Sequence, residues 1–467
     1  MRSEPMRAFQ MSRSQRRTLW TVPVLCCGLL LQGCAGQVSS GDANSYDGAM
    51  ARGDYSGAAS FATAVGHIDP EGKSINLLWS LDAGAAMVYA GPVGNTNLVF
   101  DHAEAMMRQR DLGDVKEIGQ YKAATYDGIM LDIYSATAYL HGGRRDEARV
   151  QFNRADDRVR RAEESFQKDI AAAAAKLKAD GSGDIDAAGT LLTASNSPEY
   201  QATLKDMDQY SAYEPFISPL ALYLHGVFFL TAAQRGEGAG DYAKALQSFQ
   251  RVEGMAGART VLTGDMAAAK AGKYDATALP NTWVVFEDGK SPSLASYIIR
   301  IAVPIVGKHS HVGSMSIAMP RMVPNGSAYA GLLVGAASVR TERLGSFDSV
   351  MATEFRKCQP SVLQAAVLEG LLKMVAQTAM AQTDSPLLML AAEVGSNIST
   401  TDTRSWTSLP KDFQAARIVT PKDGMVSLHT DTGVDLGSVQ VPTDHSSIIY
   451  VKILQTGAIP GIQVLPL

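Results

Sequence analysis

The sequence predicts an α+β protein, with an all-α array of helical hairpins in its N-terminal part and a mixed α/β domain in its C-terminal part. Two observations support this prediction. Before residue 279, alanine and aromatic residues recur at helical spacing, and aromatics make up only 7% of the chain, which favours closely packed helices. After Leu279-Pro280, short apolar runs alternate with glycine, proline and lysine, as is typical of strands and turns. We therefore place a helical domain at residues 46–278 and an α+β domain at residues 279–467.

Residues 1–33 have the pattern of a lipoprotein signal peptide. Five arginines and one acid precede an uncharged, mostly apolar run of 13 residues, Leu19 to Leu31. This run is shorter than the roughly 20 residues that a membrane-spanning helix needs, but it has the length of a signal-peptide h-region. It ends in Leu31-Gln32-Gly33-Cys34, which resembles a bacterial lipobox, whose cysteine becomes acylated. The alternative is a plain secretory signal with an incidental cysteine.

The lipobox implies that the protein is held to a membrane through Cys34. Several acyl chains, at about 0.8 kcal/mol per buried methylene, give stable anchoring. The resemblance also implies a sorting rule, in which an aspartate after the cysteine retains a protein at the inner membrane. Ala35 occupies that position, so we expect the outer membrane and a protein that faces the periplasm. Residues 34–45 are mostly small and polar, and they are expected to form a flexible tether.

Charge and cysteine content exclude some classes of function. The chain has 42 basic and 47 acidic residues, and loss of residues 1–33 removes 5 and 1 of them, which leaves 37 against 46 and a net charge of −9. An acidic protein of this kind does not favour nucleic acid. Only Cys358 remains besides Cys34 after processing, so no internal disulfide is expected. We expect Cys358 to be a half-buried structural thiol near a helix boundary, because no partner for a nucleophile is evident.

Several N-terminal stretches have the spacing of helical hairpins. In the clearest one, a small residue, an aromatic and a turn are followed by alanine, aromatic and alanine, at Ala136, Tyr139, Gly143, Ala148, Phe152 and Ala155. A looser copy has Gly226, Phe229, Asp241, Tyr242, Ala245 and Phe249, and a third runs from Tyr46 to Ala64. These spacings resemble a tetratricopeptide (TPR) repeat, in which small residues let two antiparallel helices approach closely. An irregular helical bundle is the alternative. The charged stretch from Arg145 to Leu177 is expected to be a long solvated helix rather than a binding patch.

Strands and helices alternate in the C-terminal part. The expected strands are Trp283–Phe286, Ser296–Val303, Ser314–Met319, Ala416–Val419, Val426–Thr430, Ser438–Val441 and Ile448–Leu454. Two helices are expected, at Ser346–Cys358 and Pro360–Gln382, with the second one buried. The apolar runs Ala328–Ala337 and Leu387–Val394 are compatible with either a strand or a helix.

Two motifs in this part carry a resemblance to a known family. The first is Asp402-Thr403-Arg404-Ser405-Trp406 with Leu409-Pro410, and the second is Val284-Val285-Phe286-Glu287-Asp288-Gly289 with Ser291-Pro292. With these motifs the chain after Cys34 resembles an uncharacterised family of bacterial outer-membrane lipoproteins with TPR-like N-terminal repeats and a C-terminal α+β domain. The resemblance implies location and architecture, and it brings no activity with it.

The segment around Trp406 has two interpretations. In the structural one, Asp402 and Arg404 pair with each other or cap neighbouring elements, and Trp406 fills the core. In the functional one, the segment is a docking site, since arginine and tryptophan dominate interface hot spots. We favour the structural one.

The function expected from the sequence is that of a non-enzymatic interaction or scaffold module that binds a protein partner of the cell envelope through its helical array. The alternative is an envelope hydrolase with a site near Asp402, Arg404 and His309. His309 and His311 have no third ligand in sight, and the loop from Lys178 to Gly189 lacks the bidentate acid of a calcium site. We therefore expect no metal, no cofactor and no catalytic residues.

Overall fold

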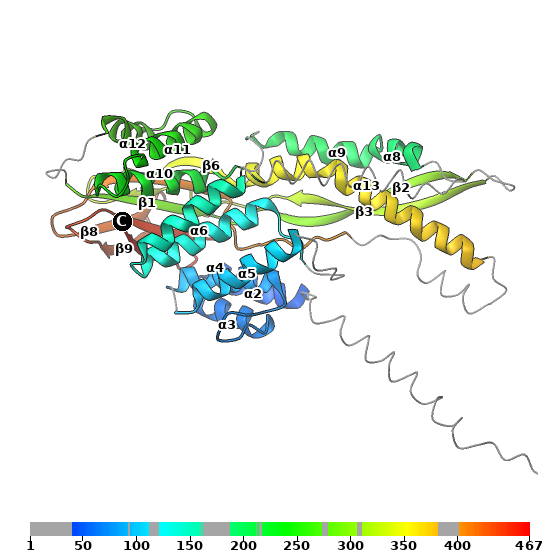
Figure 1. The fold of residues 1–467 in the computed structure, drawn as a ribbon, viewed down its shortest axis with the longest axis horizontal. Coiled ribbons are helices and arrows are strands. Elements are labelled where there is room, and N and C mark those ends of the chain that lie inside the picture. Colours follow the sequence, from blue (N-terminus) through cyan, green and yellow to red (C-terminus); the bar gives the residue numbers. More distant parts are fainter. Residues whose placement is uncertain are drawn as a thin grey trace, which may run out of the picture.

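The computed structural model describes residues 40–91, 94–111, 121–159, 161, 187–211, 213, 217–272, 279–305, 311–381 and 401–467. Helices dominate before residue 279 and strands after it (Figure 1), so the predicted α+β class with an N-terminal helical array is confirmed. Within the described ranges, the strands form a five-stranded central sheet, a four-stranded outer sheet and a long two-stranded hairpin.

The helices before residue 279 form what we call the helical layer, apart from the two helices that lie on the long hairpin. The helical layer comprises α2 (Ser40–Arg52), α3 (Tyr55–Val65), α4 (Leu77–Ala90), α5 (Thr96–Asp111), α6 (Thr125–His141), a helix that covers residues 145–159, α10 (Pro219–Gln234), α11 (Asp241–Ala256) and α12 (Thr260–Ala271). Three of them, α4, α6 and α10, are buried at nearly every position. They lie against the central sheet and are covered by the remaining helices.

Helical hairpins occur where the repeat spacing predicted them. α6 and the helix of residues 145–159 are joined through Gly142 and Gly143, and α10 is followed directly by α11. A methyl group placed on Gly226 of α10 would lie 2.5 Å from the Phe249 ring of α11, so a small residue is required at this crossing. The first helix of the described residues, α2, begins at Ser40, although residues 34–45 were expected to be a tether. Tyr46 and Met50 anchor this helix in the core.

The central sheet has the strand order β11-β10-β1-β7-β6. Only the β1–β10 pair is parallel among the described pairs of this sheet. The strands are β1 (Asn281–Asp288), β6 (Glu342–Ser346), β7 (Asp412–Val419), β10 (Ser447–Ile453) and β11 (Gly461–Pro466), and the outer sheet consists of β4 (Leu332–Val334), β5 (Val339–Arg340), β8 (Met425–Thr430) and β9 (Asp435–Gln440). β11 was not expected from the sequence.

Both faces of the central sheet are buried, which explains the nearly continuous apolar runs of β1 and β10. Trp283 and Val285 of β1 lie in the core shared with the helical layer, whereas Val284 and Phe286 lie in the core shared with the outer sheet. The helical layer and the sheet therefore have one common core, although the sequence changes character at residue 279.

A third core lies in what we call the arm, which projects from the main body in Figure 1. The arm consists of the hairpin β2 (Ser293–Ile305) and β3 (His311–Val323), the helices α8 (Ala187–Ser195) and α9 (Pro198–Asp206), and α13 (Phe347–Ala381). Its core is formed by apolar residues of all five elements.

α13 is one continuous helix, whereas two helices separated at Pro360 were expected. This prediction is wrong because the helix continues through Pro360. A proline removes one hydrogen bond and disfavours the helix interior, but here Leu363 and Val367 follow it into the core of the arm. Packing along the hairpin thus outweighs the local preference.

Candidate functional site

The segment of residues 402–410 lies between the helical layer and the end of β1. Trp406 is 1% exposed, and its ring meets the edge of Tyr134 in α6 at a centroid distance of 5.6 Å. Thr407 Oγ1 donates to Asp47 at 2.6 Å, and Ser408 Oγ lies 3.3 Å from Asp82 Oδ1. The segment therefore contacts α2, α4 and α6, which are far from it in the sequence.

Asp402 and Arg404 bind each other at the surface end of this segment. Arg404 Nε and Nη2 donate to the two carboxylate oxygens of Asp402, each at 2.8 Å. The Arg404 main-chain N–H also donates to Asp402 Oδ1 at 3.0 Å. Asp402 is therefore occupied by Arg404 on both oxygens, and the pair closes a local turn that leads Trp406 into the core.

The two sequence motifs meet in space. The main-chain N–H of Ser291 donates to the Leu409 oxygen at 2.8 Å, and that of Lys411 donates to the Asp288 oxygen at 2.9 Å. Gly289 has a φ of +67°, and a methyl group there would lie 2.7 Å from the Gly326 oxygen. A glycine is therefore required at this turn. Both motifs therefore contribute to the same junction.

A fully buried ion pair lies beneath this junction. Glu287 is opposite Lys452 in the parallel pair of β1 and β10, and Lys452 Nζ donates to Glu287 Oε2 at 3.0 Å. Both side chains are 0% exposed. Lys452 Nζ also donates to the Ser408 main-chain oxygen at 2.9 Å, so the ion pair is tied to the segment that carries Trp406.

Tyrosines enclose the Glu287 carboxylate. Tyr89 of α4 and Tyr134 of α6 donate to Oε2 at 2.5 and 3.1 Å, and Tyr450 of β10 donates to Oε1. Burial lowers the pKa of Lys452, and Glu287 opposes that shift. Buried charges need such partners, because an unpaired charge in the interior is strongly unfavourable. The cluster fastens the helical layer to the sheet, and we call it the Glu287 cluster.

A second buried acid fastens the opposite end of the helical layer. Asp265 of α12 accepts hydrogen bonds from Tyr223 of α10 at 3.0 Å, from Trp283 of β1 at 3.1 Å and from Arg417 of β7 at 2.8 Å. Its side chain is fully buried. Asp265 thus joins two helices to two strands of the central sheet.

A third contact joins the arm to the helical layer. Glu354 of α13 accepts from the main-chain N–H groups of Thr125 and Tyr126, at 2.7 and 3.2 Å. It therefore caps the N-terminus of α6, where a negative charge is favourable. Asp127 in the same turn accepts from Tyr121. Burial raises the pKa of Asp127 and of Glu354 to about 7 each.

These clusters were not identified from the sequence. The sequence signal for the Glu287 cluster is a charged residue two positions after an apolar or aromatic one within a strand. Glu287 follows Val285 in this way and Lys452 follows Tyr450, so each lies on the same face of its strand as that neighbour. The expectation of a solvated helix from Arg145 is wrong for part of that stretch. Arg158 is mostly buried and pairs with Asp132 and Glu104, because this helix packs on α6.

Other residues singled out in the sequence lie elsewhere or outside the described residues. Cys34, His309 and most of the loop from Lys178 to Gly189 lie outside them, as does Leu387–Val394. Cys358 is half-buried, but it lies inside α13 rather than near a helix boundary. In the part of the chain that the structure describes, no three His, Cys, Asp or Glu side chains gather as a metal site would require.

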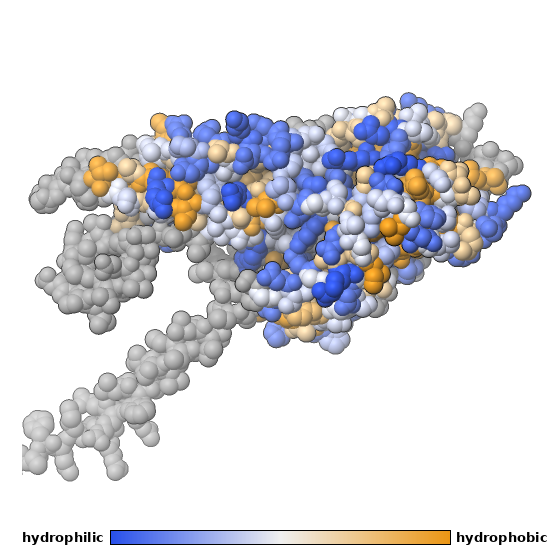
Figure 2. Space-filling model, turned by 180° about the vertical axis from the view of Figure 1, so that it is seen from behind, coloured by the Kyte–Doolittle hydropathy of each residue, from blue (hydrophilic) through white to orange (hydrophobic). Residues whose placement is uncertain are grey.

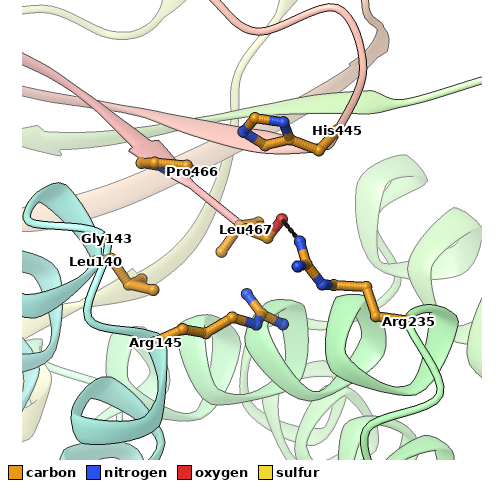
Figure 3. A pocket seen from close by; sticks show the side chains of 7 residues that line it. All are labelled: Leu140, Gly143, Arg145, Arg235, His445, Pro466 and Leu467. Carbon is orange, nitrogen blue, oxygen red and sulfur yellow. Dashed lines mark hydrogen bonds between the residues drawn. The ribbon is translucent and has the colours of Figure 1, made fainter.

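A cavity of about 310 Å³ lies where the last strand meets the helical layer (Figure 3). It is lined by Leu140, Gly143, Arg145, Arg235, His445, Pro466 and Leu467. It is separate from the Asp402–Trp406 segment, and no motif of the sequence links these lining residues to one another.

Comparisons with protein-family models, with curated proteins and with solved structures found no match. Within the described ranges, no helix combines the length and the apolar character needed to cross a bilayer.

Proposed function

We propose that this protein is a lipid-anchored envelope protein that acts as a non-enzymatic interaction or scaffold module and binds a protein partner through its helical layer. The lipobox that ends at Cys34 supports anchoring, and Ala35 supports the outer membrane with the folded part in the periplasm. The resemblance carried by the Asp402–Trp406 motif supports the same location.

The single observation that carries the interaction role is the division of the helical layer into inner and outer helices. α4, α6 and α10 are buried between the sheet and their neighbours. A partner therefore has access to the outer helices, which are α3, α5, the helix of residues 145–159, and α11. Large apolar side chains are exposed on two of them, Leu98 at 44% and Val150 at 47%. In Figure 2 exposed apolar residues form several small groups on the face shown.

The charges near the Asp402 segment support a structural rather than a catalytic use. Asp402 and Arg404 bind each other, and Glu287 accepts from three tyrosines and Lys452. These contacts hold the charged groups to one another, which favours a structural role for them. The alternative hydrolase site is therefore not our proposal.

Site-specific photo-crosslinking in cells tests the proposal. A photoreactive amino acid would replace Leu98 or Val150 on the outer helices. Met425 in β8 and Val434 in the turn before β9 serve as matched exposed controls on the side of the outer sheet. We expect one crosslinked partner of defined mass from the helical positions and none from the sheet positions. Crosslinks from the sheet positions alone, or equal crosslinks from all four, would contradict partner binding through the helical layer.

A further inference from the structure

The loop between β3 and β4 carries an asparagine followed by a glycine, Asn325-Gly326, which is the only such pair in the sequence. Asparagine is one of the heat-labile residues of proteins, because the main-chain nitrogen of the following residue can attack its side-chain amide. Glycine has no Cβ to hinder this attack. Gly326 is exposed and Asn325 is half-buried, so water reaches the loop in which the pair lies.

The main-chain nitrogen of Gly326 is not held by secondary structure. Among the residues that the structure describes, its N–H donates to no acceptor. A methyl group placed on Gly326 would have no atom within 4 Å apart from its chain neighbours. Asn196 differs in this respect, because the N–H of the next residue, Ser197, donates to the Ala194 oxygen at 3.1 Å. The nitrogen that follows Asn325 is therefore the less restrained of the two.

The amide of Asn325 holds the loop to the turn after β1. Its Nδ2 donates to the Ser291 main-chain oxygen at 2.6 Å. Ser291 is buried, and its own N–H donates to the Leu409 oxygen at 2.8 Å. The amide that would react is thus one of the contacts at the junction of the two sequence motifs.

The rest of the loop binds the same turn. The main-chain N–H groups of Ala328 and Tyr329 donate to Asp288 Oδ1 at 2.8 and 2.9 Å. A methyl group on Gly289 would lie 2.7 Å from the Gly326 oxygen, so the loop passes directly over this turn. A change in the length or charge of the loop therefore acts on the end of β1.

We propose that Asn325 is a site of spontaneous deamidation, at which the folded chain converts slowly to aspartate and isoaspartate. The Gly326 main-chain nitrogen forms a bond to the amide carbon of Asn325, and the bond from that carbon to Nδ2 breaks. The proton of the Gly326 N–H leaves with this nitrogen as ammonia. Because the reacting atoms belong to adjacent residues, the attack is intramolecular. Water then opens the cyclic imide, at one carbonyl to give aspartate and at the other to give isoaspartate.

Both products disturb the contact with Ser291. A carboxylate replaces the amide, and it has no N–H to donate to the Ser291 oxygen. Isoaspartate also lengthens the main chain by one carbon, in a loop that lies tightly against Gly289. The modified loop therefore releases Asp288 more often than the unmodified one. The proposal does not depend on the proposed protein partner.

Peptide mapping by mass spectrometry of the full chain, incubated in warm buffer at pH 8, tests the chemistry. Product at Asn325 should accumulate before product at Asn196, which is exposed but precedes a bonded N–H. Gly326→Ala should slow the conversion several-fold, because its methyl group hinders the attack and meets no other side chain. Absence of product at Asn325 in the folded protein, at a time when the urea-unfolded chain carries it, would overturn the proposal. An equal rate in Gly326→Ala would do the same.

Hydrogen exchange tests the structural consequence. Asn325→Asp reproduces one product, and the N–H groups of Ala328 and Tyr329 should exchange faster in this variant than in the parent protein, because local opening exposes them. Asn196→Asp is the matched control, since Asn196 lies outside this loop, directly after α8. Equal exchange in the parent and in Asn325→Asp would overturn the link between deamidation and the turn at Asp288.

Discussion

Trp406 meets the edge of Tyr134 with the two ring planes at 86°, which locks a C-terminal segment into helix α6. Trp406→Ala should therefore lower the free energy of unfolding by about 3–5 kcal/mol, as truncation of a buried aromatic does. Urea denaturation of the purified protein measures this loss. An unchanged midpoint together with loss of a co-purifying partner would instead favour a docking role for Trp406.

The Asp402–Arg404 pair should contribute far less to stability than Trp406. Asp402 is 42% exposed, and exposed pairs are typically worth about 0–1 kcal/mol. Each single charge reversal, Asp402→Arg or Arg404→Asp, should cost more than the double reversal, because the double variant restores an opposite-charge pair. Denaturation midpoints of the four proteins give the coupling energy. A double variant as unstable as the sum of the two singles would show that each residue has other essential contacts.

The buried pair of Glu287 and Lys452 should show strong coupling. Lys452→Met alone should destabilise the protein by about 3–5 kcal/mol, because it leaves a buried carboxylate without its cation. The double variant Glu287→Gln, Lys452→Met should recover much of this loss, since no unpaired charge remains. A double-mutant cycle in urea measures the recovery. Additive losses would contradict direct pairing.

Stability should increase as the pH falls from 8 to 6.5. The pKa values of Asp127 and Glu354 are raised to about 7 by burial, above the value of about 4 for free carboxyl groups. The folded protein then binds protons that the unfolded chain releases, so protonation favours folding in this range. Below about pH 6.5 the effect is opposed by His225, whose pKa burial lowers to about 3, because only the unfolded histidine is protonated there.

The melting temperature at pH 6.5 and at pH 8 tests this expectation. Glu354→Gln should reduce the difference between the two temperatures. Glu369→Gln is the matched control, because Glu369 is an exposed acid of the same helix. Equal pH dependence in both variants would show that Glu354 does not titrate in this range.

Lipidation can be tested at Cys34. Cys34→Ala should leave an unprocessed or soluble precursor, since acylation is expected to precede cleavage at the lipobox. Membrane fractionation and gel mobility measure both properties. A Cys34→Ala variant that still reaches mature size and remains with the membranes would refute the lipoprotein interpretation. If the parent protein fractionates at the density of the inner membrane, the outer-membrane location expected from Ala35 is wrong.

The fold class followed from periodicity, because helical hairpins and alternating strands leave local signals such as the spacing of Gly226 and Phe249. The continuity of α13 could not be predicted in this way, because packing within the arm outweighs the local effect of Pro360. The polar contacts of Glu287 join residues more than 150 positions apart, as does the contact of Asp265 with Arg417, and no local pattern reports such pairs. Arg145 and Arg235 could not be paired from the sequence for the same reason. Arg145 begins one helix and Arg235 follows the end of another, and only the tertiary fold brings them to the same cavity. Trp406 was an exception, because the apolar Leu409-Pro410 that follows it suggested burial.

The parallel pairing of β1 with β10 affects the order in which the chain can fold. β1 is complete at Asp288, but its partner begins at Ser447. Until β10 arrives, Glu287 lacks Lys452 and Tyr450, and the inner helices α4 and α6 have an incomplete surface to pack on. Contacts of such long sequence separation form slowly. The N-terminal helices therefore complete their packing only when the last strands have formed, and a chain cut short before β10 would leave Glu287 without Lys452 instead of forming a smaller stable protein.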